Sequence, residues 1–246
     1  HYFLPFNFSL NPLYNCDNFN LTDYSVKCLK WTPDHRHFWK QSTIRHTIHE
    51  KYLNSSSLIV EIGGNVGQDI AQYIRLYNST LIIYEPLTSM YKVLKEKLGN
   101  RSRTEIHRYG LGVSKRQLKI RTSGTNNEAT SMFTKENDSG KSVNETMTTI
   151  DILNIIDVLQ EILIRYKKID LLTMNCEGCE FEILPALIED TTLLTKINNI
   201  QFATHIDTLE YGICIYCKLQ QDLQRKYEIF YQYKVLWESW TKKKND

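Results

Sequence analysis

The sequence lacks several features that would place it outside the globular proteins. Its 246 residues include only ten glycines and five prolines, which excludes collagen and low-complexity chains. No apolar run reaches about 18 residues, the length of a membrane-spanning helix, so we expect no membrane contact within these residues. The 30 basic and 28 acidic side chains nearly cancel to a net charge of +2, and nucleic acid is not an expected partner. Since the chain starts at His1, an upstream signal peptide or membrane anchor is left open.

Asparagine occurs often in one pattern, the glycosylation acceptor Asn-x-Ser/Thr. Composition alone predicts about two or three such sequons. The chain has seven, which begin at Asn7, Asn20, Asn54, Asn78, Asn100, Asn137 and Asn144. This excess favours a glycosylated protein of the secretory pathway, and the alternative is an Asn-, Ser- and Thr-rich composition that forms sequons by accident. Asn54, Asn78 and Asn100 fall between predicted elements, where a glycan would not disturb packing.

Cysteine is present as an even set, which is typical of disulfide-bonded lumenal proteins. The six residues are Cys16, Cys28, Cys176, Cys179, Cys214 and Cys217. Cys16 and Cys28 suggest a local N-terminal loop, and the other four form two CxxC pairs. The gap between those pairs exceeds the usual zinc-ribbon spacing of about 15 to 20 residues, so we prefer disulfides. Free buried thiols, a zinc site and thiol redox chemistry at Cys176 and Cys179 are the alternatives.

The order of predicted elements indicates an α/β fold with a mostly parallel sheet covered on both faces. We predict strands over residues 58–62, 81–84, 104–109, 169–175 and 200–204, and helices over 66–77, 88–98, 151–166, 180–188 and 211–226. We also predict an extra strand or hairpin over 113–121, a polar loop over 123–144 and a terminal β-hairpin within 228–240.

Residues 1–52 predict an irregular N-terminal arm and a helical extension that could lie on the substrate side. Four histidines in this part suggest a metal site; they are His35, His37, His46 and His49. Their spacing favours a surface or substrate-side helix instead, and we predict no metal ligands.

The first predicted strand ends in a glycine turn, where a ligand can approach the backbone at the start of the next helix. A dinucleotide site would need glycine where the chain has Asn65 and Gln68, and the P-loop lysine pattern is absent. Glu61 stands just before the turn, and Glu85 ends the next strand. A carboxylate can accept hydrogen bonds from both hydroxyls of a ribose, as in the nucleoside site of class I S-adenosylmethionine (SAM) methyltransferases. The alternative is that both glutamates merely end strands.

Five segments resemble, in order and spacing, the FkbM family of SAM-dependent O-methyltransferases. They are Val60-Glu61-Ile62-Gly63-Gly64-Asn65-Val66-Gly67, Tyr84-Glu85-Pro86, Tyr109-Gly110-Leu111-Gly112, Thr148-Thr149-Ile150-Asp151 and Ile169-Asp170-Leu171-Leu172-Thr173-Met174-Asn175-Cys176-Glu177-Gly178-Cys179-Glu180. The match covers roughly residues 58 to 240. The last segment departs from the family pattern, because Thr173 stands for a lysine and Asn175 for an aspartate.

The resemblance implies a Rossmann-like, doubly wound sheet of seven strands over residues 53–246, with SAM as cofactor and S-adenosylhomocysteine as product. It implies that the methionine end of SAM is held by Glu61, Gly63, Gly64, Asn65 and Gly67. Glu85 would bind the ribose, and the segment from Tyr109 and Gly110 to Gly112 would border the adenine.

Methyl transfer to a hydroxyl needs an aligned oxygen and a group that removes its proton. His205 ends the fifth predicted strand and has a suitable unperturbed pKa, so we prefer it as general base. Glu177 is the second candidate, Asn175 lies beside it, and the reaction could also lack a dedicated base. His205 could instead be a structural strand-end histidine, and Glu177 a helix cap. A divalent cation is not favoured, because Asn175 replaces a carboxylate.

The family acts on hydroxyl groups of natural products and carbohydrates, and glycans are the most abundant hydroxyl substrates of the secretory lumen. The sequence therefore predicts a glycan O-methyltransferase of the secretory pathway, in the Golgi lumen or secreted. The alternatives are a methyltransferase of a lipid or small secreted metabolite, a non-catalytic module with the SAM fold, and a thiol oxidoreductase.

Overall fold

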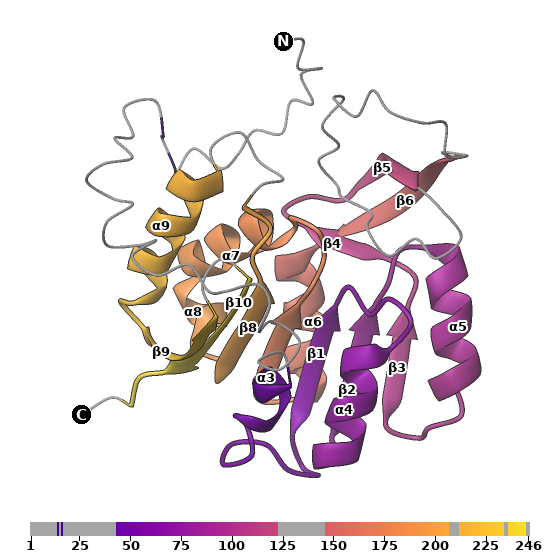
Figure 1. Cartoon of the computed structure of the whole chain (residues 1–246), viewed down its shortest axis with the longest axis horizontal. Coiled ribbons are helices and arrows are strands. Elements are labelled where there is room, and N and C mark those ends of the chain that lie inside the picture. The colour runs from indigo at the N-terminus through magenta and orange to yellow at the C-terminus, as the bar shows by residue number, and fades with distance from the viewer. Residues whose placement is uncertain are drawn as a thin grey trace.

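The computed structural model describes Tyr14, Cys16 and residues 43–122, 146–206, 212–233 and 236–244. Its centre is a seven-stranded sheet in the order β3-β2-β1-β7-β8-β10-β9 (Figure 1). The strands are β1 Leu58–Ile62, β2 Thr80–Tyr84, β3 Thr104–His107, β7 Leu171–Met174, β8 Asn199–Ala203, β9 Tyr227–Tyr233 and β10 Trp237–Lys242. The first five of these pair in parallel, and β10 pairs antiparallel with both β8 and β9. The predicted fold class and terminal hairpin are confirmed.

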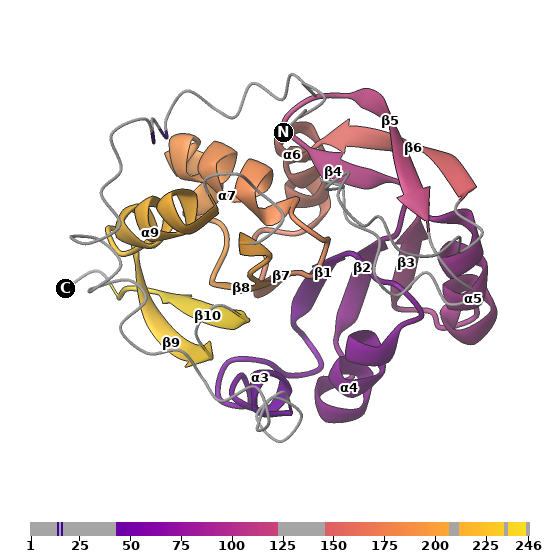
Figure 2. The same cartoon turned by 45° about the horizontal axis from the view of Figure 1, so that its top comes forward.

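Helices cover both faces of this sheet. One face carries α3 Ile44–Thr47, α4 Gln68–Tyr77 and α5 Thr88–Leu98, and the other α6 Ile155–Arg165, α7 Glu180–Glu189, α8 Thr191–Leu194 and α9 Gly212–Leu223 (Figure 2). Alternation along β1 explains why both faces are apolar. Ile59 packs with the side chains of α4 and α5, whereas Val60 and Ile62 pack with those of α6, α7 and α9.

A second sheet of three strands stands above the carboxyl end of the large sheet (Figure 1). It has the order β4-β6-β5, from β4 Gly110–Gly112, β5 Arg116–Thr122 and β6 Thr146–Asn154. Only β5 was predicted. The predicted helix over 151–166 is wrong at its start, because residues 151–154 complete β6. The side chain of Asn154 then caps α6 by accepting hydrogen bonds from the amides of Ile156 and Asp157. The predicted loop over 123–144 lies outside the described residues.

The described residues of the N-terminal arm are bonded to α9. Cys16 forms a disulfide with Cys214, and the Tyr14 hydroxyl donates to Asp222 over 3.1 Å. The predicted local pairing of Cys16 with Cys28 is therefore wrong, because the arm reaches a helix almost two hundred residues away. Cys217 is also disulfide-bonded, and Cys28 lies outside the described residues.

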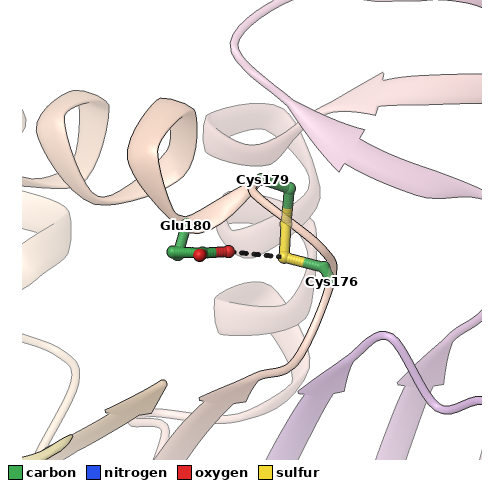
Figure 3. Close-up of side chains that lie close together, drawn as sticks. All are labelled: Cys176, Cys179 and Glu180. Carbon is green, nitrogen blue, oxygen red and sulfur yellow. Dashed lines mark hydrogen bonds between the residues drawn. A yellow bond between two sulfur atoms is a disulfide. The ribbon is translucent and has the colours of Figure 1, made fainter. Parts of the chain in front are cut away.

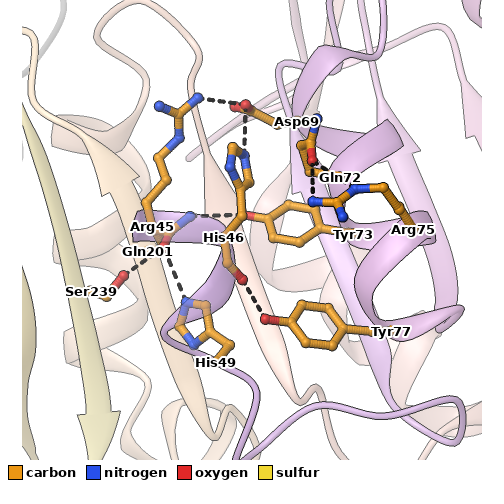
Figure 4. A network of polar contacts seen from close by, with 10 residues as sticks. All are labelled: Arg45, His46, His49, Asp69, Gln72, Tyr73, Arg75, Tyr77, Gln201 and Ser239. Carbon is orange, nitrogen blue, oxygen red and sulfur yellow. Dashed lines mark hydrogen bonds and ion pairs between the residues drawn. The ribbon is translucent and has the colours of Figure 1, made fainter. Parts of the chain in front are cut away.

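The short helix α3 lies partly at the surface, since His46 is its one buried residue and Thr47 is exposed, but the imidazoles of His46 and His49 point inward. His46 Nε2 lies 2.9 Å from Asp69 Oδ1, and His49 Nε2 lies 3.0 Å from Gln201 Oε1, so both imidazoles join this segment to its neighbours (Figure 4). Burial lowers the pKa of His49 to about 4. These two histidines are structural; His35 and His37 lie outside the described residues. No helix in the described part of the chain is both long and apolar enough to cross a membrane.

Candidate functional site

The candidate site lies at the carboxyl ends of the strands, where the chain order reverses between β1 and β7. Open α/β sheets bind ligands at such a switch point because the loops on its two sides diverge. A pocket opens there, lined by Ile62, Gly63, Asn65, Tyr84, Glu85, Pro86, Leu87, Gly110, Leu111, Ile120, Ile150, Ile152, Asn175, Cys176, Glu177 and Cys179. Of the residues predicted from the sequence, the pocket thus brings together Gly63, Asn65, Glu85, Gly110, Asn175 and Glu177.

The loop after β1 requires glycine at Gly63. Its φ is +88°, and a Cβ at this position would lie 2.1 Å from the carbonyl oxygen of Asn175 in the loop after β7. The two loops are therefore in backbone contact. Gly67 also has a positive φ of +84°, and Asn65 has φ +45°, a conformation that asparagine tolerates better than most residues. This tight turn leaves backbone atoms facing the pocket.

Glu85 is held at the tip of β2 by two backbone hydrogen bonds. One carboxylate oxygen accepts the amide of Asn65 and the other accepts the amide of Leu87, both over 2.8 Å. Burial raises the pKa of Glu85, and these two hydrogen bonds partly oppose that shift. Each carboxylate oxygen has two acceptor sites, so one remains on each oxygen for a ligand. This arrangement fits a vicinal diol such as that of a ribose.

One wall of the pocket is apolar and comes from the small sheet. Ile120 of β5 and Ile150 and Ile152 of β6 alternate with outward residues, so they form one apolar face. Gly110 packs against this face, because a Cβ there would lie 2.5 Å from the side chain of Ile152. An apolar wall beside a diol-binding carboxylate suits an adenosine.

Glu61 lies behind the glycine turn instead of lining the pocket. It is 2% exposed and shares a face of β1 with Ile59, toward α4. Burial raises the pKa of Glu61 well above its ordinary value; the charge of Asp69 adds to this and that of Arg45 opposes it. Its Oε2 has no hydrogen-bond partner among the described residues. An orphaned carboxylate oxygen beneath the turn fits a role toward the ammonium group of SAM.

The loop after β7 is closed by a disulfide between Cys176 and Cys179, which flank two residues with positive φ, Glu177 at +57° and Gly178 at +113° (Figure 3). The nearest oxygen of Glu180 lies 3.6 Å from the Cys176 sulfur. These two cysteines and Glu180 have ligand atoms within 4.8 Å of one another, the spacing of a metal site. In the disulfide, however, neither sulfur is a thiolate, so this group offers a metal only one carboxylate.

His205 lies beside the pocket, next to Glu177 and not among the lining residues. Its Nδ1 and backbone amide lie 2.8 and 3.0 Å from one oxygen of Glu180, and its Nε2 lies 3.6 Å from Glu177. Glu180 is fully buried, and its other oxygen accepts the amide of Gly178 over 3.1 Å. An ionised carboxylate only accepts hydrogen bonds, so we assign an imidazole proton to Nδ1.

Besides Glu61, three predicted binding residues lie outside the pocket lining. Gly64 packs against Ile83, since a Cβ at Gly64 would lie 2.5 Å from that side chain. Gly67 is the N-cap of α4, and Tyr109 is 39% exposed.

Sequence reasoning missed Glu180 as a partner of His205, although Glu180 stands in the most distinctive family segment. It also missed the apolar wall, for which the short polar–apolar alternation over 149–152 was the available signal.

Comparison with known proteins places this site in a family. Residues 61–217 match the family model described as Methyltransferase FkbM domain. No curated protein sequence matches the chain. Among solved structures, an O-methyltransferase from Bacillus cereus in complex with S-adenosylhomocysteine is 11% identical, with 82% of this chain and 81% of that chain covered and a TM-score of 0.46.

Two further solved structures are similar to the same extent. An rRNA methylase from Streptococcus thermophilus is 10% identical, with 82% of this chain and 95% of that chain covered and a TM-score of 0.43. The fibrillarin pre-rRNA processing protein of Methanococcus jannaschii is 10% identical, with 78% and 68% covered and a TM-score of 0.44. The family match spans well over half of the chain and includes the pocket residues of both loops. The chain belongs to the FkbM methyltransferase domain family and is a SAM-dependent methyltransferase.

Proposed function

We propose that this methyltransferase acts on oxygen, and that its acceptor is a hydroxyl group of a sugar in the lumen of the secretory pathway, most simply the Golgi. The observation that carries the proposal is the pair of His205 and Glu180 beside the pocket. Such a pair can remove a proton from an acceptor that must lose one in order to react.

SAM, when bound, supplies a methyl group on a positively charged sulfur. Gly63 and Asn65 would hold its methionine end, Glu85 its ribose, and Ile150 and Ile152 its adenine. Each assignment rests on the fit described above: a backbone cradle, a diol acceptor and an apolar wall.

His205 accepts the proton of the acceptor hydroxyl at Nε2. The buried carboxylate of Glu180 keeps the other proton on Nδ1, orients the ring, and stabilises the imidazolium that forms. Glu177, 3.6 Å from Nε2, adds a second negative charge. General base action of this kind contributes typically about 10² to 10⁴ fold in rate.

A sugar is favoured by the polar groups near His205. Glu177 and Asn175 both line the pocket and can accept hydrogen bonds from neighbouring hydroxyls. The compartment is supported by the disulfides, because such bonds persist in oxidising environments, and by the exposed sequons.

Incubation of the protein with methyl-labelled SAM and a panel of N-glycans, glycosaminoglycans and simple glycosides tests the proposal. We expect label on a sugar oxygen by mass spectrometry, and we expect a chelator to leave the rate unchanged. His205→Ala should lower the rate of labelling by about 10² to 10⁴ fold but retain S-adenosylhomocysteine binding.

Label on a lipid or small metabolite would support the methyltransferase reaction but contradict the proposed sugar acceptor. Protein that binds S-adenosylhomocysteine but labels nothing would contradict the proposal and favour a non-catalytic module. Loss of activity with chelator would show that a cation acts beside Asn175 and Glu177.

A further inference from the structure

Three sequons lie at one end of the molecule. Asn54 lies in the loop before β1, Asn78 between α4 and β2, and Asn100 between α5 and β3. Since β1, β2 and β3 are parallel, the loops that precede them share the amino end of the sheet, opposite to the pocket (Figure 1).

The side chains at these three positions are accessible. In the described chain, the exposed asparagines are Asn54, Asn78 and Asn100, and all three stand in sequons. Asn65 and Asn175, which line the pocket, are only partly exposed and lack Ser or Thr two residues later. At the amino end of the sheet, the asparagines are thus both exposed and part of a sequon. The two asparagines at the pocket are neither.

The amide nitrogens of the three residues are not used by the fold. The side-chain oxygen of Asn54 accepts hydrogen bonds from Ser56, and that of Asn78 accepts one from Arg101 over 2.9 Å. Within the described residues, none of the three Nδ2 atoms donates a hydrogen bond. A group attached at Nδ2 would break no contact described here.

Two arginines hold the loops in place. Arg103 donates to the carbonyls of Ser55 and Asn78, and Arg101 donates to the carbonyl of Ser79 over 2.8 Å. The three loops are thus joined through backbone carbonyls, and a modified asparagine side chain leaves these bonds intact.

We propose that Asn54, Asn78 and Asn100 are N-glycosylated, so that the amino end of the sheet is a glycan-covered face and the carboxyl end stays open to the acceptor. The inference rests on the lumenal location proposed above. The donor class is an oligosaccharide linked to a lipid diphosphate.

In the transfer, the asparagine Nδ2 forms a bond to C1 of the first sugar, and the bond from C1 to the diphosphate oxygen breaks. The lipid diphosphate leaves with the electron pair, and the amide loses one proton to a base of the transferring enzyme. No oxidant or reductant is needed.

The test uses the full chain, secreted behind a signal peptide from cultured animal cells. Deglycosylation by a peptide amidase in ¹⁸O-water converts each occupied asparagine into labelled aspartate, which peptide mass spectrometry locates. We expect label at Asn54, Asn78 and Asn100. Ser102→Ala is a matched variant, because this exposed serine makes no described hydrogen bond and its loss should remove label from Asn100 alone.

The triple variant Asn54→Gln, Asn78→Gln, Asn100→Gln should lose the mass of three glycans and bind S-adenosylhomocysteine as the parent does. Recovery of the three peptides without label, from protein whose Cys16–Cys214 disulfide is intact, would overturn the inference. Unlabelled peptides in a protein that methylates sugars would overturn the proposed glycosylation but support the proposed reaction. Labelled peptides in a protein without sugar methylation would support it and contradict the proposed reaction.

Discussion

The loops after β1 and β7 line the same pocket but are stabilised in different ways. The loop after β1 depends on glycine, with positive φ at Gly63 and Gly67, and on a hydrogen bond from the amide of Asn65 to Glu85. The loop after β7 has one glycine, Gly178, and is fixed by a disulfide and by the buried carboxylate of Glu180. In the function proposed above, the first loop offers backbone to the cofactor, and the second orients side chains for proton transfer.

Backbone conformation shows the same difference. Glu177 has φ +57°, which costs a non-glycine residue about 1 to 2 kcal/mol. The disulfide joins the residues on either side of Glu177 and Gly178, and Glu180 accepts the amide of Gly178. The surrounding bonds must hold a strained residue in its conformation, and strained residues at a ligand pocket are typical of functional sites.

The largest effect is expected from Glu180→Ala. The change removes the carboxylate that accepts hydrogen bonds from His205 and from the buried amide of Gly178, so turnover should fall about 10² to 10⁴ fold. Steady-state kinetics measures this, and the pH–rate profile should change, because the carboxylate proposed to stabilise the imidazolium is removed. Glu96→Ala, an exposed glutamate on α5, is the control and should behave as the parent. An unchanged pH profile in Glu180→Ala would contradict a positioning role.

The contact between the loops is tested by Gly63→Ala. A Cβ at Gly63 would overlap the carbonyl oxygen of Asn175, so we expect the affinity for S-adenosylhomocysteine to fall about 100-fold, or roughly 3 kcal/mol. Calorimetry measures the affinity. Gly67→Ala is matched in φ, but its Cβ would meet only the side-chain ends of Leu94 and Leu98, and it should mainly lower thermal stability. Equal affinity losses in both variants would refute the backbone contact as the cause.

The affinity for S-adenosylhomocysteine should fall at acidic pH through Glu85. Its pKa is raised by burial, and only the carboxylate accepts two hydroxyls, so binding weakens as pH falls through this raised value, earlier than for an ordinary glutamate. Because the pKa of Glu85 is higher in the folded protein than in the unfolded chain, its protonation at low pH favours the folded state. A loss of binding at acidic pH would therefore not come from unfolding caused by Glu85. Glu85→Gln should bind about tenfold more weakly and without this pH dependence. Parallel pH curves in both proteins would exclude Glu85 as the titrating group.

The smallest effect is expected from removal of the disulfide by Cys176→Ser and Cys179→Ser together. The second loop should loosen, with turnover reduced roughly fivefold, about 1 kcal/mol, and cofactor affinity nearly unchanged. The matched pair Cys16→Ser and Cys214→Ser removes a bond that ties the arm to α9. That variant should lose thermal stability and keep its turnover. The reverse pattern would show that the disulfide at the pocket only stabilises the fold.

Much of the large sheet can be predicted from the sequence. The strand over 58–62 and the helix over 88–98 have the predicted bounds, because a continuous apolar run and a clear helical period are local signals. The glycine turn and Glu85 were also predictable, since each stands at the end of such a strand.

The small sheet and the pair of His205 and Glu180 depend on partners far away in the sequence. Gly110 pairs with Ile152, and His205 contacts Glu180, 25 residues away, so neither contact is visible in a local pattern. Ile152 was assigned to a helix because its apolar neighbours also fit a helical period. The bond between Cys16 and Cys214 spans 198 residues, and six cysteines allow too many pairings for sequence to select it.

The separation of cofactor binding from proton transfer is tested most directly by calorimetric titration of S-adenosylhomocysteine into the parent protein, Glu85→Ala and His205→Ala. The account predicts tight binding to the parent and to His205→Ala, and binding at least about tenfold weaker to Glu85→Ala. Equal weakening in both variants, or no binding to the parent, would contradict it.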